Sequence, residues 1–460
     1  MNKYDAVIIG FGKGGKTLAA ELAGKGWTVA LVERSAQMYG GACINVACIP
    51  TKAMVHLSGI ARCRKFPSFE QQASFYREAV AATRKLVTGL REKNYELLHN
   101  NERITVITGE AAFTSPHEIE ITTGTGRFTV RSEKIFINTG SEPVIPDITG
   151  VTASRRVYTS ETMLRLEQLP RRLVIVGGGY VGLEFACMYA GFGSQVTVLD
   201  HHPRLLPKED DDIAACVKKT LEKKGVVFHE DVLVQSVHDE TNETSVSYIH
   251  LSTEAMHRIP ADAVLLATGR KAAVERLNLQ AAGVRTDEHG AIDADLHLHT
   301  SAPHIRVLGD AKGAPLFTYV SLDDYRIVAD ELFGDAHRTT ADREPIPSVV
   351  YIDPPLATIG LREEEAFLAG CNIRVARLAA SEIGRALTLE EPEGLLKIVV
   401  NADTNRLIGC AFFCAGADEI INLAAVAIHA KLDYRLLRDQ VFTHPSMSEA
   451  FNKLLSLIDR

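Results

Sequence analysis

The chain carries the same glycine-rich pattern twice, and each copy lies between an apolar run and an amphipathic stretch. In both copies a second apolar run follows and ends on an acidic residue, and the same number of residues separates the first glycine from that acid. The glycines and the acid are Gly10, Gly12, Gly15 and Glu33 in the first copy, and Gly177, Gly179, Gly182 and Asp200 in the second. An apolar run, a glycine turn and an amphipathic stretch in this order predict a strand, a tight turn and a helix.

This context favours two dinucleotide-binding sites. Glycines permit the tight turn and a close approach of a pyrophosphate to the helix N-terminus, and the acid accepts hydrogen bonds from ribose hydroxyls. Each copy is followed later by an apolar run that ends on Thr-Gly, at Thr139-Gly140 and at Thr268-Gly269. We therefore expect Thr139, Gly140 and Gly269 to lie near the bound nucleotides.

The pattern predicts an α/β fold with two Rossmann-like dinucleotide-binding domains and a C-terminal α+β domain. A proline- and glycine-rich linker at 143–150 separates the two copies, and the last part of the chain alternates apolar strands with amphipathic helices without a nucleotide motif. The expected division is 1–150 for the first domain, 151–275 for the second, 276–340 for a return to the first, and 341–460 for the C-terminal domain.

Composition limits the partners of the chain. The net charge of −8 provides no basic field for nucleic acid or an anionic membrane. No apolar run approaches 18 residues and no signal peptide precedes the first strand, so we expect no membrane span and a cytoplasmic location. In that compartment most of the eight cysteines should be free thiols. We interpret the charged run 208–212 as a solvated helix start.

Two cysteines, Cys43 and Cys48, follow shortly after the first acid. A disulfide between them would close only a short loop, so its entropic stabilisation would be small, which suits an exchangeable bond. Pro50 fits the first turn of a helix and places Cys48 near the helix N-terminus, where the helix dipole and Lys52 would favour the thiolate. From the residues alone, a loop with two unpaired cysteines stays open as the alternative.

A histidine near the C-terminus has a carboxylate close to it in sequence. His444 precedes Pro445, and Glu449 could orient its ring, as proton transfer near neutral pH requires. The alternative is a structural histidine at a helix start. We expect Cys410 and Cys414 to be core thiols, and no metal-ligand spacing is present, so no metal is expected.

These segments, together with 300–310, resemble the class I flavoprotein disulfide reductases, such as lipoamide dehydrogenase, glutathione reductase and mercuric reductase. The resemblance covers essentially the whole chain. It implies FAD at the first glycine motif, with Asp310 on the ribityl chain, and a nicotinamide cofactor at the second. It also implies a redox-active Cys43–Cys48 disulfide, in which Cys48 faces the flavin and Cys43 is the exposed thiol that attacks the acceptor.

The same resemblance implies several further roles. Tyr180 would be the aromatic gate over the nicotinamide pocket, and Glu184 would pair with Lys52 beside the flavin. His444 with Glu449 would be the acid/base pair and would serve the disulfide of the other subunit, which implies a homodimer built through 341–460. The sequence departs from the family pattern at Ala42, Ala47 and Ser446, and at 271–273, where the common Pro-Asn is missing.

Several segments are closer still to the reactive-chlorine-resistance flavoproteins. That branch implies reduction of a small oxidant, such as hypothiocyanous acid or Cu(II), in defence against oxidative stress. Asp200 favours NADH over NADPH, because a carboxylate repels a 2′-phosphate. No cysteine pair follows Glu449, which disfavours a mercuric reductase. The alternatives are a dihydrolipoamide dehydrogenase or other disulfide reductase, and a redox sensor without turnover.

Overall fold

The computed structural model describes residues 2–458. By its internal contacts the chain forms two compact units. The first comprises the chain up to Ala53 together with Glu78–Ile145 and Gly269–Arg343, and the second comprises Met54–Arg77, Pro146–Thr268 and the chain from Glu344 onward. The division into four segments at 150, 275 and 340 stays a prediction.

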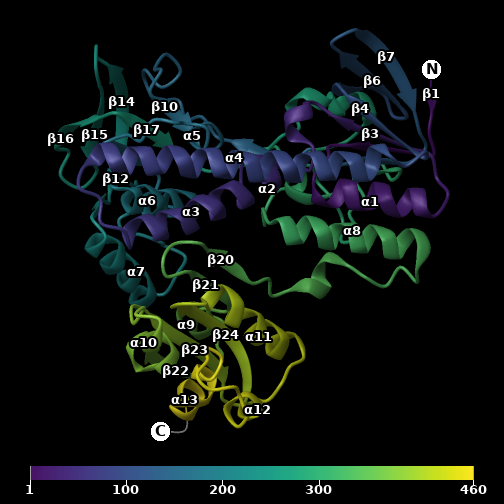
Figure 1. Ribbon diagram of the computed structural model, residues 1–460. Helices are drawn as coiled ribbons and strands as arrows, with labels where there is room; N and C mark the ends of the chain where they lie inside the picture. Colours follow the sequence, from purple (N-terminus) through teal and green to yellow (C-terminus); the bar gives the residue numbers. More distant parts are fainter. Residues whose placement is uncertain (1, 459–460) are drawn as a thin grey trace. The chain divides into compact units, whose positions relative to one another are not determined.

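The first unit is built on a five-stranded parallel sheet with the order β19-β8-β2-β3-β4. The strands are β2 (Ala6–Ile9), β3 (Val29–Glu33), β4 (Ile104–Thr108), β8 (Ile135–Ile137) and β19 (Ile305–Val307). The central strands β2 and β8 are short runs of fully buried apolar residues, as expected of a parallel sheet that is covered on both faces. Helix α1 (Lys13–Gly24) follows the glycine turn and lies beside α8 (Thr318–Phe333) (Figure 1).

Two smaller sheets complete this unit. A four-stranded sheet has the order β1-β7-β6-β5, with the strands β1 (Asn2–Lys3), β5 (Glu110–Ser115), β6 (Glu118–Thr123) and β7 (Gly126–Arg131). An antiparallel ribbon pairs β9 (Ser141–Pro143) with β18 (Arg270–Ala272). Gly140 and Gly269 directly precede its two strands, and both have positive φ.

The second unit repeats the parallel arrangement with the order β10-β17-β11-β12-β13. Its strands are β10 (Val157–Thr159), β11 (Arg172–Val176), β12 (Gln195–Leu199), β13 (Val226–His229) and β17 (Ala263–Leu266), and its helices are α5 (Ser160–Met163), α6 (Tyr180–Phe192) and α7 (Asp211–Lys223). The glycine-turn strand again lies between the acid-bearing strand and the strand that precedes Thr-Gly. The internal repeat is therefore a repeat of topology.

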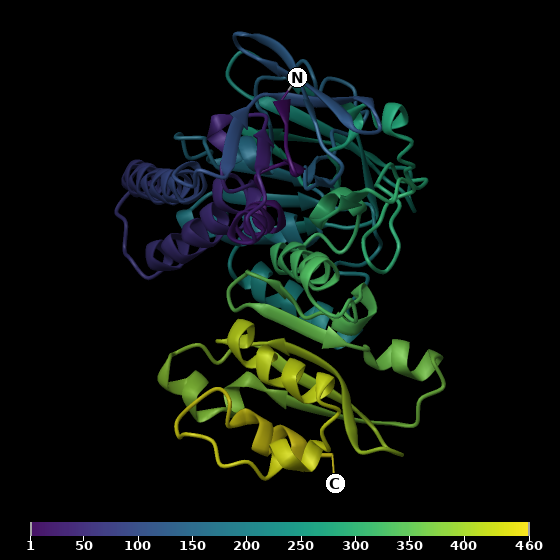
Figure 2. The same ribbon diagram turned by 90° about the vertical axis from the view of Figure 1, so that its right-hand side faces the viewer.

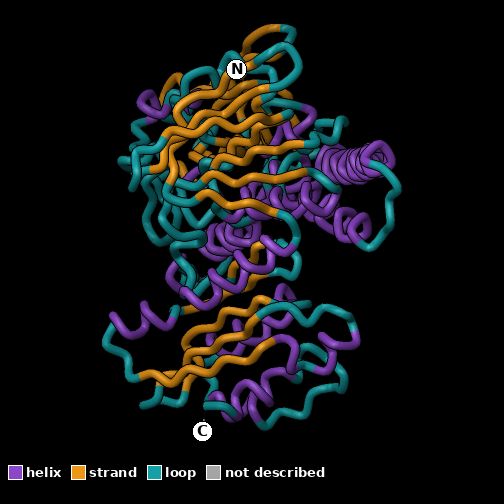
Figure 3. Tube along the Cα trace, turned by 90° about the vertical axis from the view of Figure 1, so that its left-hand side faces the viewer, coloured by secondary structure: helices purple, strands orange, loops and turns teal. Residues whose placement is uncertain are grey.

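Antiparallel sheets form the rest of this unit. The first consists of β14 (Val232–Asp239), β15 (Thr244–His250) and β16 (Met256–Ala261). The C-terminal sheet has the order β20-β21-β24-β23-β22 (Figure 3, orange), with the strands β20 (Ser348–Val350), β21 (Leu356–Gly360), β22 (Ile373–Ala379), β23 (Leu395–Asn401) and β24 (Arg406–Phe413). Its helices are α9 (Glu363–Leu368), α10 (Gly384–Thr388), α11 (Ala417–His429), α12 (Tyr434–Arg438) and α13 (Ala450–Ser456). Helices α11 and α13 pack on this sheet (Figure 2, yellow).

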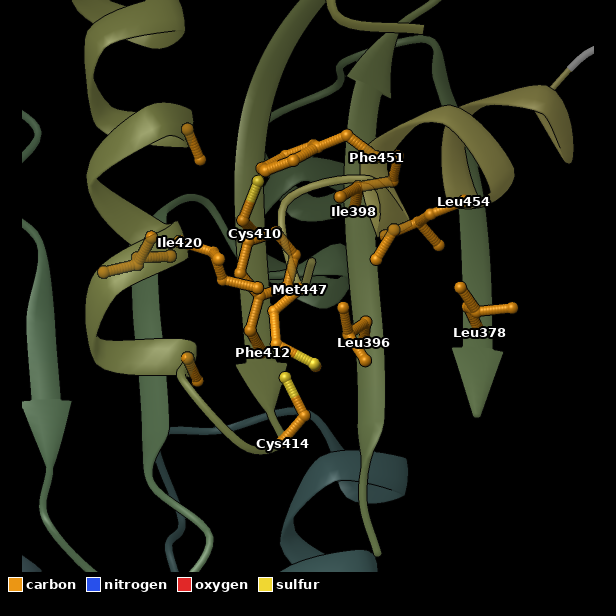
Figure 4. Packing of buried hydrophobic residues seen from close by; sticks show 14 of the residues in the cluster. Leu378, Leu396, Ile398, Cys410, Phe412, Cys414, Ile420, Met447, Phe451 and Leu454 are labelled. Atoms are coloured by element: carbon orange, nitrogen blue, oxygen red, sulfur yellow. The ribbon is translucent and has the colours of Figure 1, made fainter. Parts of the chain in front are cut away.

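The core of the C-terminal sheet contains two of the cysteines. Cys410 lies beside Phe451, and Cys414 lies beside Met447 (Figure 4). Both thiols are buried and free, and burial raises the pKa of both, that of Cys414 to about 12. The prediction that they are core thiols is confirmed.

The remaining helices are α2 (Ala42–Asn45), α3 (Cys48–Arg62) and α4 (Phe69–His99). Among the described residues, only the stretch Ala42–Arg62 has the length and mean hydropathy (1.2) to cross a membrane. This is weak evidence for a span, because an ordinary core helix passes the same test.

The interpretation of 208–212 as a solvated run is wrong for Glu209 and Asp210, whose side chains are buried. Glu209 is 3% exposed and forms an ion pair with Arg362 at 3.2 Å. Lys397, which is 2% exposed, forms ion pairs with Asp210 at 2.8 Å and Asp212 at 3.1 Å. Burial of the Glu209 and Asp210 side chains is tolerated because cations from the C-terminal segment neutralise them, which local sequence cannot reveal.

Candidate active site

The first glycine turn is held by Asn138, the residue after β8. Asn138 is buried, accepts a hydrogen bond from the Gly15 amide (2.8 Å) through Oδ1, and donates to the Leu308 carbonyl (2.8 Å) through Nδ2. A Cβ at Gly10 would lie 2.2 Å from the Asn138 carbonyl oxygen, and one at Gly15 would lie 2.6 Å from the Gly10 oxygen. Only glycine therefore allows this strand, turn and helix to pack so closely.

The acid of the first copy lies at the same turn. Glu33 accepts hydrogen bonds from the amides of Phe11 (3.1 Å) and Ser35 (3.2 Å), and burial raises the pKa of its carboxyl. Next to Asn138, the hydroxyl of Thr139 is buried and has no hydrogen-bond partner among residues 2–458. An orphaned buried hydroxyl at a glycine turn beside an acid fits a site that a bound dinucleotide completes.

Asp310 lies in a short 3-10 helix after β19. Its Oδ2 accepts a hydrogen bond from the Ser141 hydroxyl (2.7 Å), and Arg270 donates to the same hydroxyl (2.9 Å). The fully buried Asp324 accepts from the amide of Gly309 (2.7 Å) and fixes the residue before Asp310. Gly140 directly precedes Ser141, so the hydrogen bond between Ser141 and Asp310 brings Gly140 and Asp310 close together. Both residues lie in the first unit, which also contains the glycine turn.

The cysteine segment crosses directly over the first glycine turn. Gly41 has φ +82°, and a Cβ there would lie 2.7 Å from the Cα of Gly12. Asn45 fixes the segment by donating to the carbonyls of Tyr39 and Gly41, each at 2.9 Å. Helix α3 begins at Cys48, as the sequence predicts. Both cysteines therefore lie beside the candidate FAD site.

The two thiols interact directly and differ in acidity. A hydrogen bond from Cys43 lowers the pKa of Cys48 to about 6, helped by Thr318 and the charge of Lys52. The same hydrogen bond, together with burial, raises the pKa of Cys43. The Cys48 sulfur lies 3.4 Å from the Thr318 hydroxyl. The family resemblance predicts that Cys43 is the exposed thiol, but both cysteines are half-buried, so exposure does not distinguish them. The two thiols differ instead in their pKa.

Lys16, which no motif predicts, is part of this site. It lies on α1, hydrogen-bonds with Asn94, and lies near enough to Cys43 to interact with its charge. Burial lowers the pKa of Lys16 to about 8. Sequence reasoning missed Lys16, Thr318 and Asn138. The one local signal in the sequence is that Lys16 directly follows Gly15 of the first glycine motif.

The second glycine turn has the same design. A Cβ at Gly182 would lie 2.0 Å from the Gly177 carbonyl oxygen, whereas one at Gly179 would meet nothing within 4 Å. Gly179 therefore leaves the turn open on the side where a pyrophosphate would approach. Asp200 is 5% exposed, and its Oδ2 lies 2.4 Å from the position of a Cβ on Gly178. The acid thus lies against the turn, as the fingerprint requires.

The candidate gate residue is tethered. The Tyr180 hydroxyl donates to Glu209 (2.7 Å), which also binds Arg362, and burial and the Glu209 charge raise the pKa of Tyr180. Glu184 is buried and accepts from the Tyr351 amide (2.9 Å). Glu184 belongs to the second compact unit, while Lys52 belongs to the first. Their pairing stays a prediction.

His444 and Glu449 are brought together. His444 Nδ1 lies 2.8 Å from a Glu449 carboxylate oxygen, and the Ser446 amide donates to the other oxygen (3.4 Å). The histidine side chain is 78% exposed and the glutamate side chain 23%. This arrangement leaves Nε2 of an oriented imidazole open to a reaction partner.

Comparison with known proteins agrees with this geometry. Residues 4–324 match the family model described as pyridine nucleotide-disulphide oxidoreductase, and 346–455 match the dimerisation domain of the same family. The chain is 43% identical to the probable pyridine nucleotide-disulfide oxidoreductase RclA of Escherichia coli, with full coverage of both chains. It is 33% identical to a dihydrolipoyl dehydrogenase of Thermus scotoductus, covering 98% of this chain and 96% of the relative.

A solved structure is also similar. The Cu(II) complex of the HOCl-induced flavoprotein disulfide reductase RclA from Escherichia coli superposes with a TM-score of 0.94 at 43% identity, covering 99% of this chain and all of the other. The α/β fold with two Rossmann-like domains and a C-terminal dimerisation domain is thereby confirmed. The chain belongs to the pyridine nucleotide-disulphide oxidoreductase family, whose members are FAD-dependent enzymes that use a pyridine nucleotide.

Proposed function

We propose that this enzyme uses NADH to reduce a small oxidant of the hypothiocyanous acid or Cu(II) type through the Cys43–Cys48 pair, in defence against oxidants. The observation that carries the proposal is the hydrogen-bonded cysteine pair, with opposite shifts in acidity, above the first glycine turn. Similarity to a reductase described as HOCl-induced and studied with Cu(II) supports the choice of acceptor class.

The cofactor residues divide into two sets. Gly10, Gly12, Gly15, Glu33 and Asp310, with Thr139 and Gly140, would hold FAD; Gly177, Gly179, Gly182 and Asp200, with Tyr180 and Gly269, would hold NADH. When bound, FAD would take a hydride from the reduced nicotinamide and return an electron pair to the disulfide. The buried Asp200 carboxylate supports NADH over NADPH, because it accepts bonds from a 2′-hydroxyl and repels a 2′-phosphate.

The two cysteines would have different chemical roles because the pKa values of their thiols differ. Cys48 rests as the thiolate, stabilised by Cys43, Thr318 and the charge of Lys52. Cys43 holds its proton, so it needs a base before it can attack. We assign this proton transfer to His444, oriented by Glu449, from the second subunit of the family's homodimer.

With hypothiocyanous acid the chemistry balances without another reactant. The Cys43 sulfur attacks the sulfur of the acid, and a new S–S bond gives a Cys43 sulfenyl thiocyanate as the S–O bond breaks. Hydroxide leaves and takes up the proton from His444 as water. The Cys48 thiolate then attacks the Cys43 sulfur and displaces thiocyanate, which regenerates the disulfide. Two electrons pass from the cysteine pair to the acceptor in each cycle.

An acceptor panel tests this proposal. NADH oxidation by the holoenzyme is followed with hypothiocyanous acid, Cu(II), glutathione disulfide and lipoamide, and NADPH is compared as donor. We expect turnover with the first or second acceptor and its loss in Cys43→Ser and Cys48→Ser. Turnover restricted to lipoamide, with reduction of NAD⁺ by dihydrolipoamide, would establish a dihydrolipoamide dehydrogenase. Negligible NADH oxidation with every acceptor would establish a redox sensor. A cytoplasmic location stays a prediction from composition.

A further inference from the structure

Two adjacent histidines converge with the acid of the second glycine motif. His201 Nδ1 and His202 Nδ1 lie 3.4 Å and 3.1 Å from Asp200 Oδ1. One ligand atom from each of the three residues lies within 4.8 Å of the others. The sequence predicts no metal site because it contains no ligand spacing of a known metal motif, and three consecutive residues match none of those spacings.

The separations of these atoms suit a small divalent cation. In a tetrahedral zinc site with bonds of about 2.0–2.2 Å, neighbouring ligand atoms lie roughly 3.3 Å apart. The separations of both imidazole nitrogens from Asp200 Oδ1 lie close to this value. Two imidazoles and one carboxylate are also a ligand set that zinc uses in proteins.

The surroundings leave room for one more ligand. The His201 and His202 side chains are 65% and 42% exposed, whereas the Asp200 side chain is only 6% exposed. The His202 amide donates to the same oxygen, Oδ1 (3.2 Å), and so fixes the orientation of the buried carboxylate, while the two imidazoles are open to solvent. A bound ion could keep a water molecule in its fourth position.

We propose that Asp200, His201 and His202 bind a divalent transition-metal ion, represented by Zn²⁺, and that the ion antagonises NADH binding. The antagonism rests on the proposed function, in which Asp200 accepts the ribose hydroxyls. Oδ2 faces the glycine turn while Oδ1 faces the histidines, so an ion on Oδ1 removes one of the two acceptor oxygens.

Calorimetric titration of the oxidised holoenzyme with ZnCl₂ tests the site, because closing the Cys43–Cys48 disulfide removes that thiol pair as a competing zinc site; the exposed Cys63 thiol is present equally in the wild type and in the variants. We expect one zinc ion per chain, and no such site in the double variant His201→Gln/His202→Gln. His289→Gln is the matched control, since His289 is an exposed histidine (83%) beside a carboxylate. Binding of NAD⁺ should weaken the binding of zinc by about fivefold or more.

The outcomes separate the two claims. Equal zinc uptake by the double variant, or none by the wild type, overturns the metal site. Zinc uptake that is lost in the double variant but is unaffected by bound NAD⁺ keeps the site and overturns the antagonism. Failure of NAD⁺ to bind the zinc-free wild type overturns the proposed function instead.

Discussion

The Thr318 hydroxyl offers a direct way to change the acidity of Cys48. It lies 3.4 Å from the Cys48 sulfur and helps lower the pKa of that thiol to about 6. A hydrogen bond to a charged group contributes about 1.5–3 kcal/mol, and we take the low end because sulfur is a weak acceptor and the contact is long. Since one pKa unit corresponds to about 1.4 kcal/mol, Thr318→Val should raise the Cys48 pKa by about one unit, to about 7.

The assay is the long-wavelength charge-transfer absorbance between thiolate and flavin in the two-electron-reduced enzyme, followed against pH. The band requires the thiolate, so it should fade as pH drops through the Cys48 pKa, near 6 in the wild type and about one unit higher in Thr318→Val. Thr318→Ser is the matched control, because it keeps the hydroxyl and loses only a methyl group. An unchanged midpoint in Thr318→Val, or an equal shift in Thr318→Ser, would refute the role of the hydrogen bond.

Three further predictions follow from the sites. His444→Gln should slow turnover with the acceptor by about 10²–10⁴-fold, because the proton transfer from Cys43 is lost. Anaerobic reduction of the enzyme by NADH, followed by stopped flow, should be unchanged, and equal slowing of both steps would contradict the prediction. Arg362→Met should cost roughly 3 kcal/mol of stability, because it leaves the buried Glu209 carboxylate without its cation and with the Tyr180 hydroxyl as a neutral partner. Adding Glu209→Leu to this variant should restore part of the melting temperature, and no recovery would contradict the prediction. Gly41→Ala should reduce the flavin retained after dialysis, because its Cβ meets the Gly12 backbone, whereas Gly59→Ala, with open space around it, should not.

Local motifs predicted the features of this protein that depend on local chemistry. The glycine turns, the acids at the strand ends and the helix that begins at Cys48 all follow from residue types at fixed spacing. These features are local because a tight turn, a helix start or a ribose acceptor is determined within a few residues.

Features that arise from tertiary contacts were not predictable. Asn138 joins Gly15 to Leu308, and Thr318 reaches Cys48 from 270 residues away along the chain. The acid Glu209 appears solvated in the sequence because its partner, Arg362, lies 153 residues further on. A single sequence carries no signal for such pairs, because each residue alone is compatible with an ordinary surface or core position.

The most direct test of the central claim is an anaerobic titration of the oxidised holoenzyme with NADH, followed by alkylation and mapping of the thiols by mass spectrometry. We predict that Cys43 and Cys48 become alkylated in step with NADH consumption, while the buried Cys410 and Cys414 keep the reactivity that they have before reduction. Consumption of NADH with reduction of the flavin, but without new alkylation at Cys43 and Cys48, would contradict a reductase that works through this cysteine pair.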